Sequence, residues 1–223
     1  MKLLAAAFVI LIGSLVAWEF VRQEFFVIER FRYRFTITFE ADGKLVSGSS
    51  VTQVIIHAPP CWPLEDNCTS FEYKGSAFPL VFPNGSTLLV LMGNANANNL
   101  GVGSLPFPFL PKTPRAEYGS NEFLGKKNPV QDQYIPTLLY FSDFQKIESL
   151  AIIDPYNMPK AFGDHVAYEG STVEYTNDPV TIIPIKKYFP WLPAFEKLSP
   201  LKQEALIPRN LMLGFTTYFE RND

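Results

Sequence analysis

Two small groups of residues could support chemistry, and both depend on the only two histidines of the chain. Ser49 and Ser50, in "SGSSV", are candidate nucleophiles with His57 or His165 as the base. The nucleophile elbow requires Gly-x-Ser-x-Gly on a strand-to-helix turn, whereas these serines lie between two strand-like runs with no second glycine after them. A bulge or bend built from small polar residues is the simpler interpretation.

A second group combines the histidines with the only two cysteines, Cys61 and Cys68, in "CWPLEDNC". Together they offer four side chains of the types that bind zinc, but the close paired spacing of zinc sites is missing. A disulfide between Cys61 and Cys68, closing a short proline-containing loop, is favoured over a metal site or free thiols. No P-loop, dinucleotide fingerprint or HExxH motif is present, so we assign no metal ligand and expect no cofactor.

The acidic residues outside the first segment are scattered, and the candidates among them are Glu65, Asp66, Asp143, Asp154, Asp164 and Asp178. Two carboxylates at a suitable separation can hydrolyse glycosides, but a sequence does not fix a separation. Asp154-Pro155 and Asp178-Pro179 are typical of turns, because aspartate caps a turn and proline fixes its backbone. We therefore assign no catalytic residue and expect a protein that is not an enzyme.

Composition narrows the class of protein. The chain has 223 residues, of which 47% are hydrophobic and 18% charged, and its net charge is −3. It has no basic stripe with interleaved aromatic residues, so nucleic acid is not an expected partner. The 19 prolines and 13 glycines favour many turns and short elements over long helices.

The first segment predicts a membrane anchor over residues 1–22. Leu3 to Val21 reads "LLAAAFVILIGSLVAWEFV" and contains one charge, Glu19. At 1.5 Å per residue such a helix crosses about 30 Å of hydrocarbon. A cleaved signal peptide is the main alternative, although Leu15 is a poor outer residue for cleavage after Ala17, and a buried core helix is the third.

The orientation signals conflict. Lys2 lies before the apolar segment and four arginines follow it, which by the positive-inside rule places the body in the cytoplasm. A disulfide at Cys61 and Cys68 instead indicates an oxidising compartment. We favour export, with a single pass through the bacterial inner membrane and the body in the periplasm.

The body, residues 30–223, is predicted to be one mainly β (α+β) domain. "FRYRFTITFE" alternates apolar and polar residues as a half-buried strand does. Asp42-Gly43 predicts a hairpin turn into a second strand, "LVSGSSVTQVII", with a bulge or bend at Gly48-Ser49-Ser50. Asn84-Gly85 predicts another hairpin between "AFPLVF" and "TLLVLM". These hairpins form either a sandwich or a single sheet with short helical cover.

The remaining segments are less regular. Residues 93–133 are rich in Asn, Pro and Gly and predict a long loop. "IPTLLYF" (135–141) and "HVAYEGSTVEYT" (165–176) predict strands, and residues 143–153 form either a strand or a helical turn. "VTIIPIKKYF" predicts a short helix that begins near Pro184, and Ser199 before a proline predicts another.

One segment combines lysines with aromatic residues and is a possible surface for a partner or for lipid. Lys186, Lys187 and Trp191 could contact anionic headgroups, because tryptophan favours membrane interfaces and lysines add attraction. The favoured alternative is that Ile182, Ile185, Phe189 and Trp191 pack onto the sheet while the lysines face water.

The hairpins and the last segment together resemble an uncharacterised family of proteobacterial proteins with one N-terminal membrane segment. The resemblance covers most of Tyr33 to Leu192, and "SGSSV" and "DPVTIIPIKKYFPWL" carry it most strongly. It implies bacterial origin, an envelope location and a shared fold, and no established activity. The Asn/Pro-rich loop and the Cys61–Cys68 loop depart from the family pattern. We therefore expect a non-catalytic binding or assembly module with an unknown envelope partner, and a lipid-binding domain or an exported hydrolase as alternatives.

Overall fold

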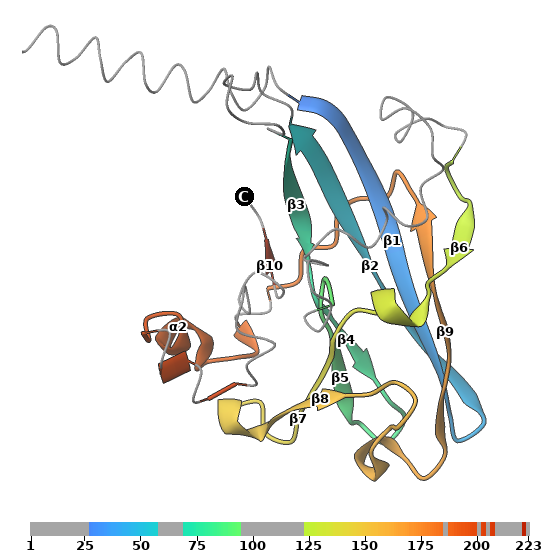
Figure 1. The fold of residues 1–223 in the computed structure, drawn as a ribbon. Helices are drawn as coiled ribbons and strands as arrows, with labels where there is room; N and C mark the ends of the chain where they lie inside the picture. The colour runs from blue at the N-terminus through green and yellow to red at the C-terminus, as the bar shows by residue number, and fades with distance from the viewer. Residues whose placement is uncertain are drawn as a thin grey trace, which may run out of the picture.

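A computed structural model describes residues 27–57, 69–94, 123–184, 187–199, 202–203, 206–207 and 220–221. In these ranges the chain is mainly β, as the sequence predicts (Figure 1). The strands are β1 (Val27–Ala41), β2 (Lys44–His57), β3 (Ser70–Ser76), β4 (Phe78–Val81), β5 (Thr87–Val90), β6 (Lys127–Pro129), β7 (Leu138–Phe141), β8 (Leu150–Ile153), β9 (Val166–Tyr175) and β10 (Glu220–Arg221). The helical elements are η3 (Asp132–Tyr134), η4 (Ile147–Ser149), η5 (Lys160–Phe162) and α2 (Leu192–Phe195).

The strands form two antiparallel sheets. The six-stranded sheet has the order β10-β3-β2-β1-β9-β6, and the four-stranded sheet has the order β4-β5-β7-β8. The chain passes from the first sheet to the second at Ala77, the single residue between β3 and β4. Short loops connect most neighbouring strands, which explains the many turn signals in the sequence.

The long β1–β2 hairpin forms the centre of the six-stranded sheet. Ala41 pairs with Lys44, and Asp42 and Gly43 between them have φ of 51° and 75°. Positive φ at both central residues gives the turn a twist that suits a two-residue hairpin loop. The Asp42-Gly43 prediction is thus confirmed, and Asn84-Gly85 likewise connects β4 to β5, with Gly85 at φ 85°.

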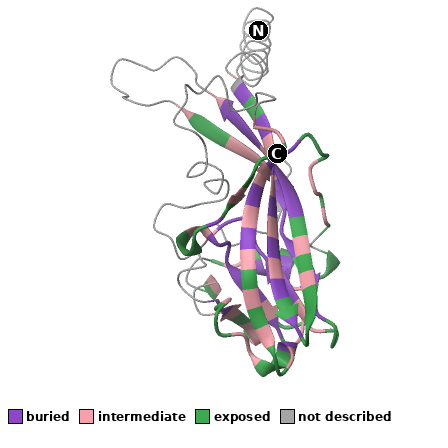
Figure 2. Ribbon diagram, turned by 90° about the vertical axis from the view of Figure 1, so that its right-hand side faces the viewer, coloured by how far each residue is buried: buried purple, intermediate pink, exposed green. Residues whose placement is uncertain are grey.

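The main core lies between the two sheets. The odd-numbered residues of β1 from Phe31 to Ala41 point into it, and the even-numbered residues face outward. Figure 2 shows the resulting bands of buried and exposed residues along the long strands. Leu80, Leu88 and Leu138 meet this face from the four-stranded sheet.

A second apolar cluster covers the opposite face of the four-stranded sheet. Leu89 and Leu139 point away from the main core and pack with Phe189 and Leu192 of the C-terminal segment around α2. Both faces of β5 and β7, the central strands of the four-stranded sheet, are therefore largely buried, and "TLLV" and "LLYF" are apolar without alternation for that reason. The two predicted architectures are combined here, with two sheets and a helical cover.

The expected bulge at Gly48 is wrong. Gly48 pairs in regular register with Ile37, and the β1–β2 ladder is continuous from Glu29 to the turn. A Cβ atom at Gly48 would lie 2.8 Å from Phe78 Cε2 and 2.9 Å from Leu80 Cδ1. Glycine is therefore required by the close approach of β4 and not by an irregular backbone.

The segment 177–184 runs extended across the six-stranded sheet, and Thr181 N donates to Val51 O at 2.9 Å. A helical turn begins near Pro184, as the sequence predicts, because Pro184 O accepts from Lys187 N at 3.0 Å. The helix α2 lies further on, and another turn follows Ser199 as predicted, with Ser199 O accepting from Lys202 N at 2.9 Å.

The predicted loop 93–133 is irregular only in part. Its last described residues include β6, which pairs with β9 through Asn128 and Val173, and the turn η3. Residues 143–153 contain both predicted alternatives in succession, η4 and then β8. The predicted strands 135–141 and 165–176 are confirmed as β7 and β9.

The predicted anchor, residues 1–22, and the cysteine pair Cys61 and Cys68 lie outside the described residues. Within the ranges that the structure describes, no helix is long and apolar enough to cross a membrane.

Candidate functional site

The candidate serine nucleophiles and the histidines lie far apart. Ser50 and His57 are seven positions apart on one strand, roughly 23 Å at 3.3 Å per residue. His165 adjoins the Asp42 turn, where Asp42 N donates to its carbonyl at 3.1 Å, and is near the opposite end of the sheet from His57. The serine–histidine pair required for nucleophilic catalysis is therefore absent from this arrangement.

The same separation removes the four-ligand zinc set, because His57 and His165 cannot reach one metal ion. His57 Nε2 instead lies 3.3 Å from Glu72 Oε2, on the neighbouring strand. No group of three or more metal-binding side chains gathers in the described part of the chain.

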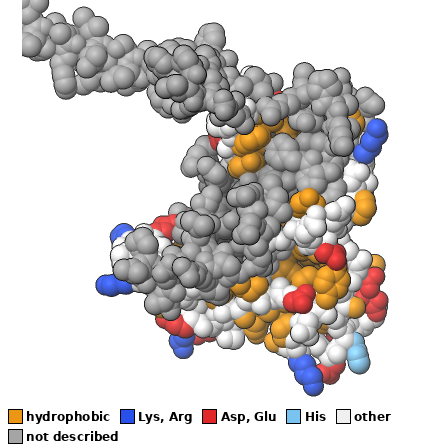
Figure 3. Space-filling view, in the orientation of Figure 1, with side chains coloured by type: hydrophobic (Ala, Val, Ile, Leu, Met, Phe, Trp, Pro, Cys, Tyr) orange, Lys and Arg blue, Asp and Glu red, His pale blue; other side chains and the backbone are white. Residues whose placement is uncertain are grey.

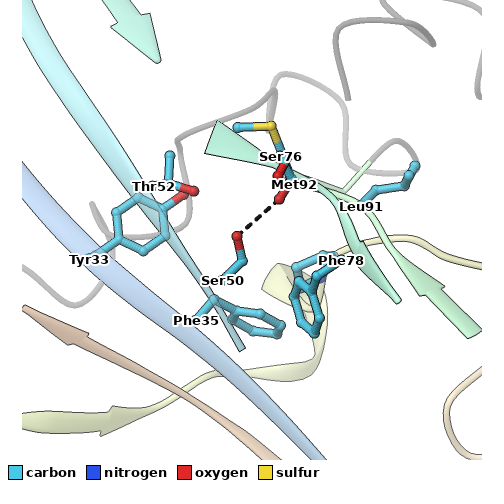
Figure 4. A pocket seen from close by; sticks show the side chains of 9 residues that line it. Tyr33, Phe35, Ser50, Thr52, Ser76, Phe78, Leu91 and Met92 are labelled. Carbon is cyan, nitrogen blue, oxygen red and sulfur yellow. Dashed lines mark hydrogen bonds between the residues drawn. The ribbon is translucent and has the colours of Figure 1, made fainter. Parts of the chain in front are cut away.

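Ser50 has a structural partner. Its hydroxyl donates to Ser76 O at 2.9 Å (Figure 4). Ser76 Oγ in turn donates to Thr181 O at 3.1 Å and accepts from Ile183 N at 2.8 Å. Ser50 and Ser76 are buried, so these bonds satisfy polar groups that water does not reach. We call Ser50, Ser76 and Thr181 the serine clamp, because they fix the segment 177–184 to the point where the chain changes sheets.

Beside the serine clamp is a cavity of about 10 Å³. Tyr33 and Thr52 line it, and burial raises the pKa of Tyr33, an effect that the Thr52 side chain opposes only in part. The cavity is about the size of one water molecule and cannot hold an organic ligand.

Of the two predicted turn-forming aspartates, Asp154 caps its turn, since its Oδ1 accepts from Tyr156 N at 3.0 Å. Asp143, at which the sequence predicted no aspartate-capped turn, does the same, since its Oδ1 accepts from Gln145 N at 2.9 Å. Asp178 pairs with Arg34, and Arg32 donates to the carbonyls of Asn177 and Asp178 at 3.2 and 3.1 Å. The β1 arginines thus hold the start of the crossing segment.

Among the described residues, a cleft of about 350 Å³ is large enough for a ligand, and it lies where β7 begins and β8 ends. Its lining residues are Asn94, Asp132, Ile135, Pro136, Thr137, Leu138, Ile152, Ile153, Asp154, Pro155 and Tyr156. We call it the Asp132–Asp154 cleft. On the face drawn in Figure 3, acidic side chains lie among hydrophobic ones in the lower right of the described surface.

The floor and the rim of the Asp132–Asp154 cleft differ in polarity. Ile135, Leu138 and Ile153 are buried members of the main core and give an apolar floor. Asp132 and Asp154 are exposed at the rim, and the described residues that line the cleft include no lysine or arginine. An apolar floor with a few polar groups at its rim is typical of a ligand site.

Tyr156 organises the rim. Its hydroxyl donates to Asp132 Oδ1 at 2.5 Å, and this hydrogen bond raises its pKa from 10.0 to about 12. Its ring meets Tyr168 of β9 edge-to-face at 5.2 Å between centroids. Tyr156 thereby joins η3, the turn after β8 and the six-stranded sheet, while 60% of its surface stays exposed.

The lysine-and-tryptophan segment is divided by the structure. Trp191 is half-buried, its Nε1 donates to Phe144 O at 3.1 Å, and its ring lies 5.4 Å from that of Phe189. Lys187 is exposed, and Lys186 lies outside the described residues. The expected packing of Ile182 is wrong, since it is 52% exposed while Ile183 packs on both clusters.

Sequence reasoning missed Asp132 and Tyr156. The sequence predicted a turn at Asp154, because Asp-Pro is typical of turns. Asp132 belongs to no recognisable motif. The two aspartates are 22 positions apart in sequence and meet because β7 and β8 pair antiparallel between them. Only strand pairing brings them to one end of the sheet.

No protein-family model, no curated protein and no solved structure matches this chain. The resemblance to a proteobacterial envelope family stays a prediction.

Proposed function

We propose that this protein is a non-catalytic binding or assembly module of the bacterial envelope, and that the Asp132–Asp154 cleft is its binding surface. The observation that carries the proposal is the cleft itself, about 350 Å³ with an apolar floor and exposed carboxylates. Both carboxylates accept hydrogen bonds from Tyr156, which positions them for recognition. The envelope location and the anchor over residues 1–22 come from the apolar first segment.

A site-specific photocrosslink tests the binding role. A benzophenone amino acid replaces Tyr156 in the full chain within bacterial membranes, and the matched control carries it at Tyr188. The two positions are equally exposed, at 60% and 59%, but Tyr188 does not line the cleft. We expect a discrete crosslinked partner from position 156 that disappears in the Asp132→Asn/Asp154→Asn background. Equal crosslinking from both positions, or crosslinking unaffected by the aspartate changes, contradicts the proposal.

Thiol labelling tests the compartment. If the body lies in the periplasm, Cys61 and Cys68 form a disulfide and react with an alkylating reagent only after reduction. The control is the same labelling in cells that lack periplasmic disulfide formation, where both thiols react directly. Direct labelling of both cysteines in ordinary cells contradicts the periplasmic location.

Membrane-surface binding is the second candidate function. The observation that favours it is that Lys187 is exposed and that Tyr188 and Ile182 nearby in the sequence are 59% and 52% exposed. Trp191, in contrast, contributes to packing. We expect liposomes containing anionic lipid to bind the domain less after Lys186→Glu/Lys187→Glu if this function is real. Unchanged binding after both substitutions rejects it, and neutral liposomes serve as the control.

A further inference from the structure

The hydrogen bonds already formed in the Asp132–Asp154 cleft favour a ligand that carries hydrogen-bond donors. Asp132 uses Oδ1 to accept from the Tyr156 hydroxyl, and Asp154 uses Oδ1 to accept from Tyr156 N. The second oxygen of each carboxylate remains available, and neither aspartate has an ion-pair partner in the described part of the chain. The Tyr156 proton is already donated. A ligand here must therefore supply donors.

The charge of the cleft narrows the class of ligand further. Two carboxylates face the cleft, and its lining residues in the described part of the chain include no lysine or arginine. A neutral donor such as a sugar hydroxyl satisfies the oxygens but leaves the negative charge unbalanced. A guanidinium supplies several donors in a plane and the opposite charge, which makes its hydrogen bonds to carboxylates about twice as strong as neutral ones.

The floor of the cleft fits the rest of such a side chain. Ile135, Leu138 and Ile153 offer buried apolar surface below the rim. An arginine side chain places its methylene stem on apolar surface and its charged head at the polar edge. The exposed ring of Tyr156 adds a face on which a guanidinium stacks.

Strand β8 provides a way to present that side chain. β8 is an edge of the four-stranded sheet and pairs with β7 on one side only, within the described residues. Ile152 and Ile153 belong to β8 and also line the cleft. An extended segment that pairs with the free edge of β8 thus runs directly past the cleft.

We propose that the Asp132–Asp154 cleft binds an arginine side chain carried by an extended segment of a partner protein, and that this segment adds as a strand to β8. The inference rests on the proposed function and specifies what the binding module recognises. The carboxylates hold the guanidinium, the apolar floor holds the stem, and the backbone of β8 holds the segment.

Calorimetric titration of the full chain in detergent tests the arginine head group. The probes are N-acetyl-arginine amide and N-acetyl-citrulline amide, which have the same shape but differ in charge. We expect the arginine probe to bind at least about tenfold more tightly, the ratio that one or two charge-assisted hydrogen bonds give. Binding of the arginine probe should fall by a similar factor in Asp132→Asn/Asp154→Asn.

The matched control variant is Glu40→Gln/Glu148→Gln, which removes the same charge from exposed residues outside the cleft. It should bind the arginine probe as the unmodified chain does. An equal loss in both double variants would show general charge attraction and would overturn the proposal. Equal affinity for arginine and citrulline probes, or tighter binding of glucose, overturns it as well while leaving a binding role for the cleft intact.

A pentapeptide pair tests the strand. Acetyl-Val-Thr-Arg-Thr-Val-amide should bind more tightly than N-acetyl-arginine amide. Alternate residues of a strand direct their N–H groups to opposite edges, so N-methylation of one set, either the two threonine nitrogens or the valine and arginine nitrogens, should remove that gain. If neither N-methylated peptide binds more weakly, pairing with β8 is wrong. If the photocrosslink from position 156 is specific but no arginine probe binds, the inference fails and the proposed function stands. If the crosslink is also absent, both fail.

Discussion

β1 and β5 contribute to the same core from opposite sides, yet their sequences have different patterns. β1 alternates apolar and polar residues because one face meets the core and the other meets solvent or the crossing segment. β5 is apolar at three successive positions because Leu88 and Val90 face the main core while Leu89 faces the C-terminal cluster. A short unbroken apolar run in an antiparallel sheet therefore indicates a third layer.

The two sheets also differ in how many positions are available for polar contacts. In the six-stranded sheet, every second residue of β1 is available for polar contacts, and Arg32 and Arg34 use this face to hold the segment 177–184. In the four-stranded sheet, β5 is buried at Leu88, Leu89 and Val90. The Asp132–Asp154 cleft lies where β7 begins and β8 ends.

The largest expected loss of stability tests whether packing on the second face of the central strands of the four-stranded sheet stabilises the fold. Leu139→Ala removes a fully buried side chain from the C-terminal cluster and should lower the free energy of unfolding by about 2–5 kcal/mol. Thr36→Ala, on the outward face of β1, should change it by about 0.5 kcal/mol or less. Urea denaturation measures both. A loss for Leu139→Ala no larger than that for Thr36→Ala would contradict a stabilising role for the C-terminal cluster.

The next effect concerns the contact between the sheets at Gly48. Gly48→Ala places a methyl group 2.8 Å from Phe78 Cε2, so the side chains of Phe78 and Leu80 must shift, and we expect a loss of about 1–3 kcal/mol. Ser49→Ala is the control, because Ser49 is exposed on the other face of the same strand. Thermal and urea denaturation check the difference. Equal stability of the two variants would mean that the sheets are not closely packed at this point.

The serine clamp gives an effect of similar or smaller size. Ser76→Ala leaves Ile183 N–H and Thr181 C=O without their hydroxyl partner, and we expect a loss of about 1–3 kcal/mol. Ser47→Ala removes an exposed hydroxyl bonded to Thr38 at 2.8 Å and should cost much less. Hydrogen exchange at Ile183 should quicken in Ser76→Ala alone. Unchanged exchange would show that the crossing segment is held by other contacts.

The smallest expected effect concerns the hydrogen bond between Tyr156 and Asp132 at the rim of the Asp132–Asp154 cleft. Because the hydrogen bond to Asp132 raises the pKa of Tyr156 to about 12, above its ordinary 10.0, the bond stabilises the fold below about pH 10. That contribution is lost as the pH rises through about 12. Asp132→Asn should return the pKa toward 10.0, as measured by the ultraviolet absorbance of phenolate. Glu148→Gln is the control and should leave the titration unchanged.

Much of the fold could be predicted from the sequence because its causes are local. Alternation in "FRYRFTITFE" requires a strand with one buried face, and Asp42-Gly43 and Asn84-Gly85 adopt the backbone that hairpin turns need. Asp154 likewise caps its own turn. Gly48 shows the limit, since a glycine in a strand indicates either a bulge or a close neighbour, and the neighbour is Phe78 from another sheet.

The sequence by itself determined that the chain is mainly β, where its hairpins turn, and that its histidines and serines belong to no recognisable catalytic motif. Tertiary structure alone decided that the hairpins divide between two sheets, that the segment 177–184 is extended, and that Trp191 packs in the C-terminal cluster. It also brought Asp132 beside Asp154. The physical reason is that turn and strand preferences act over a few residues, whereas burial and strand pairing depend on segments far apart in the chain.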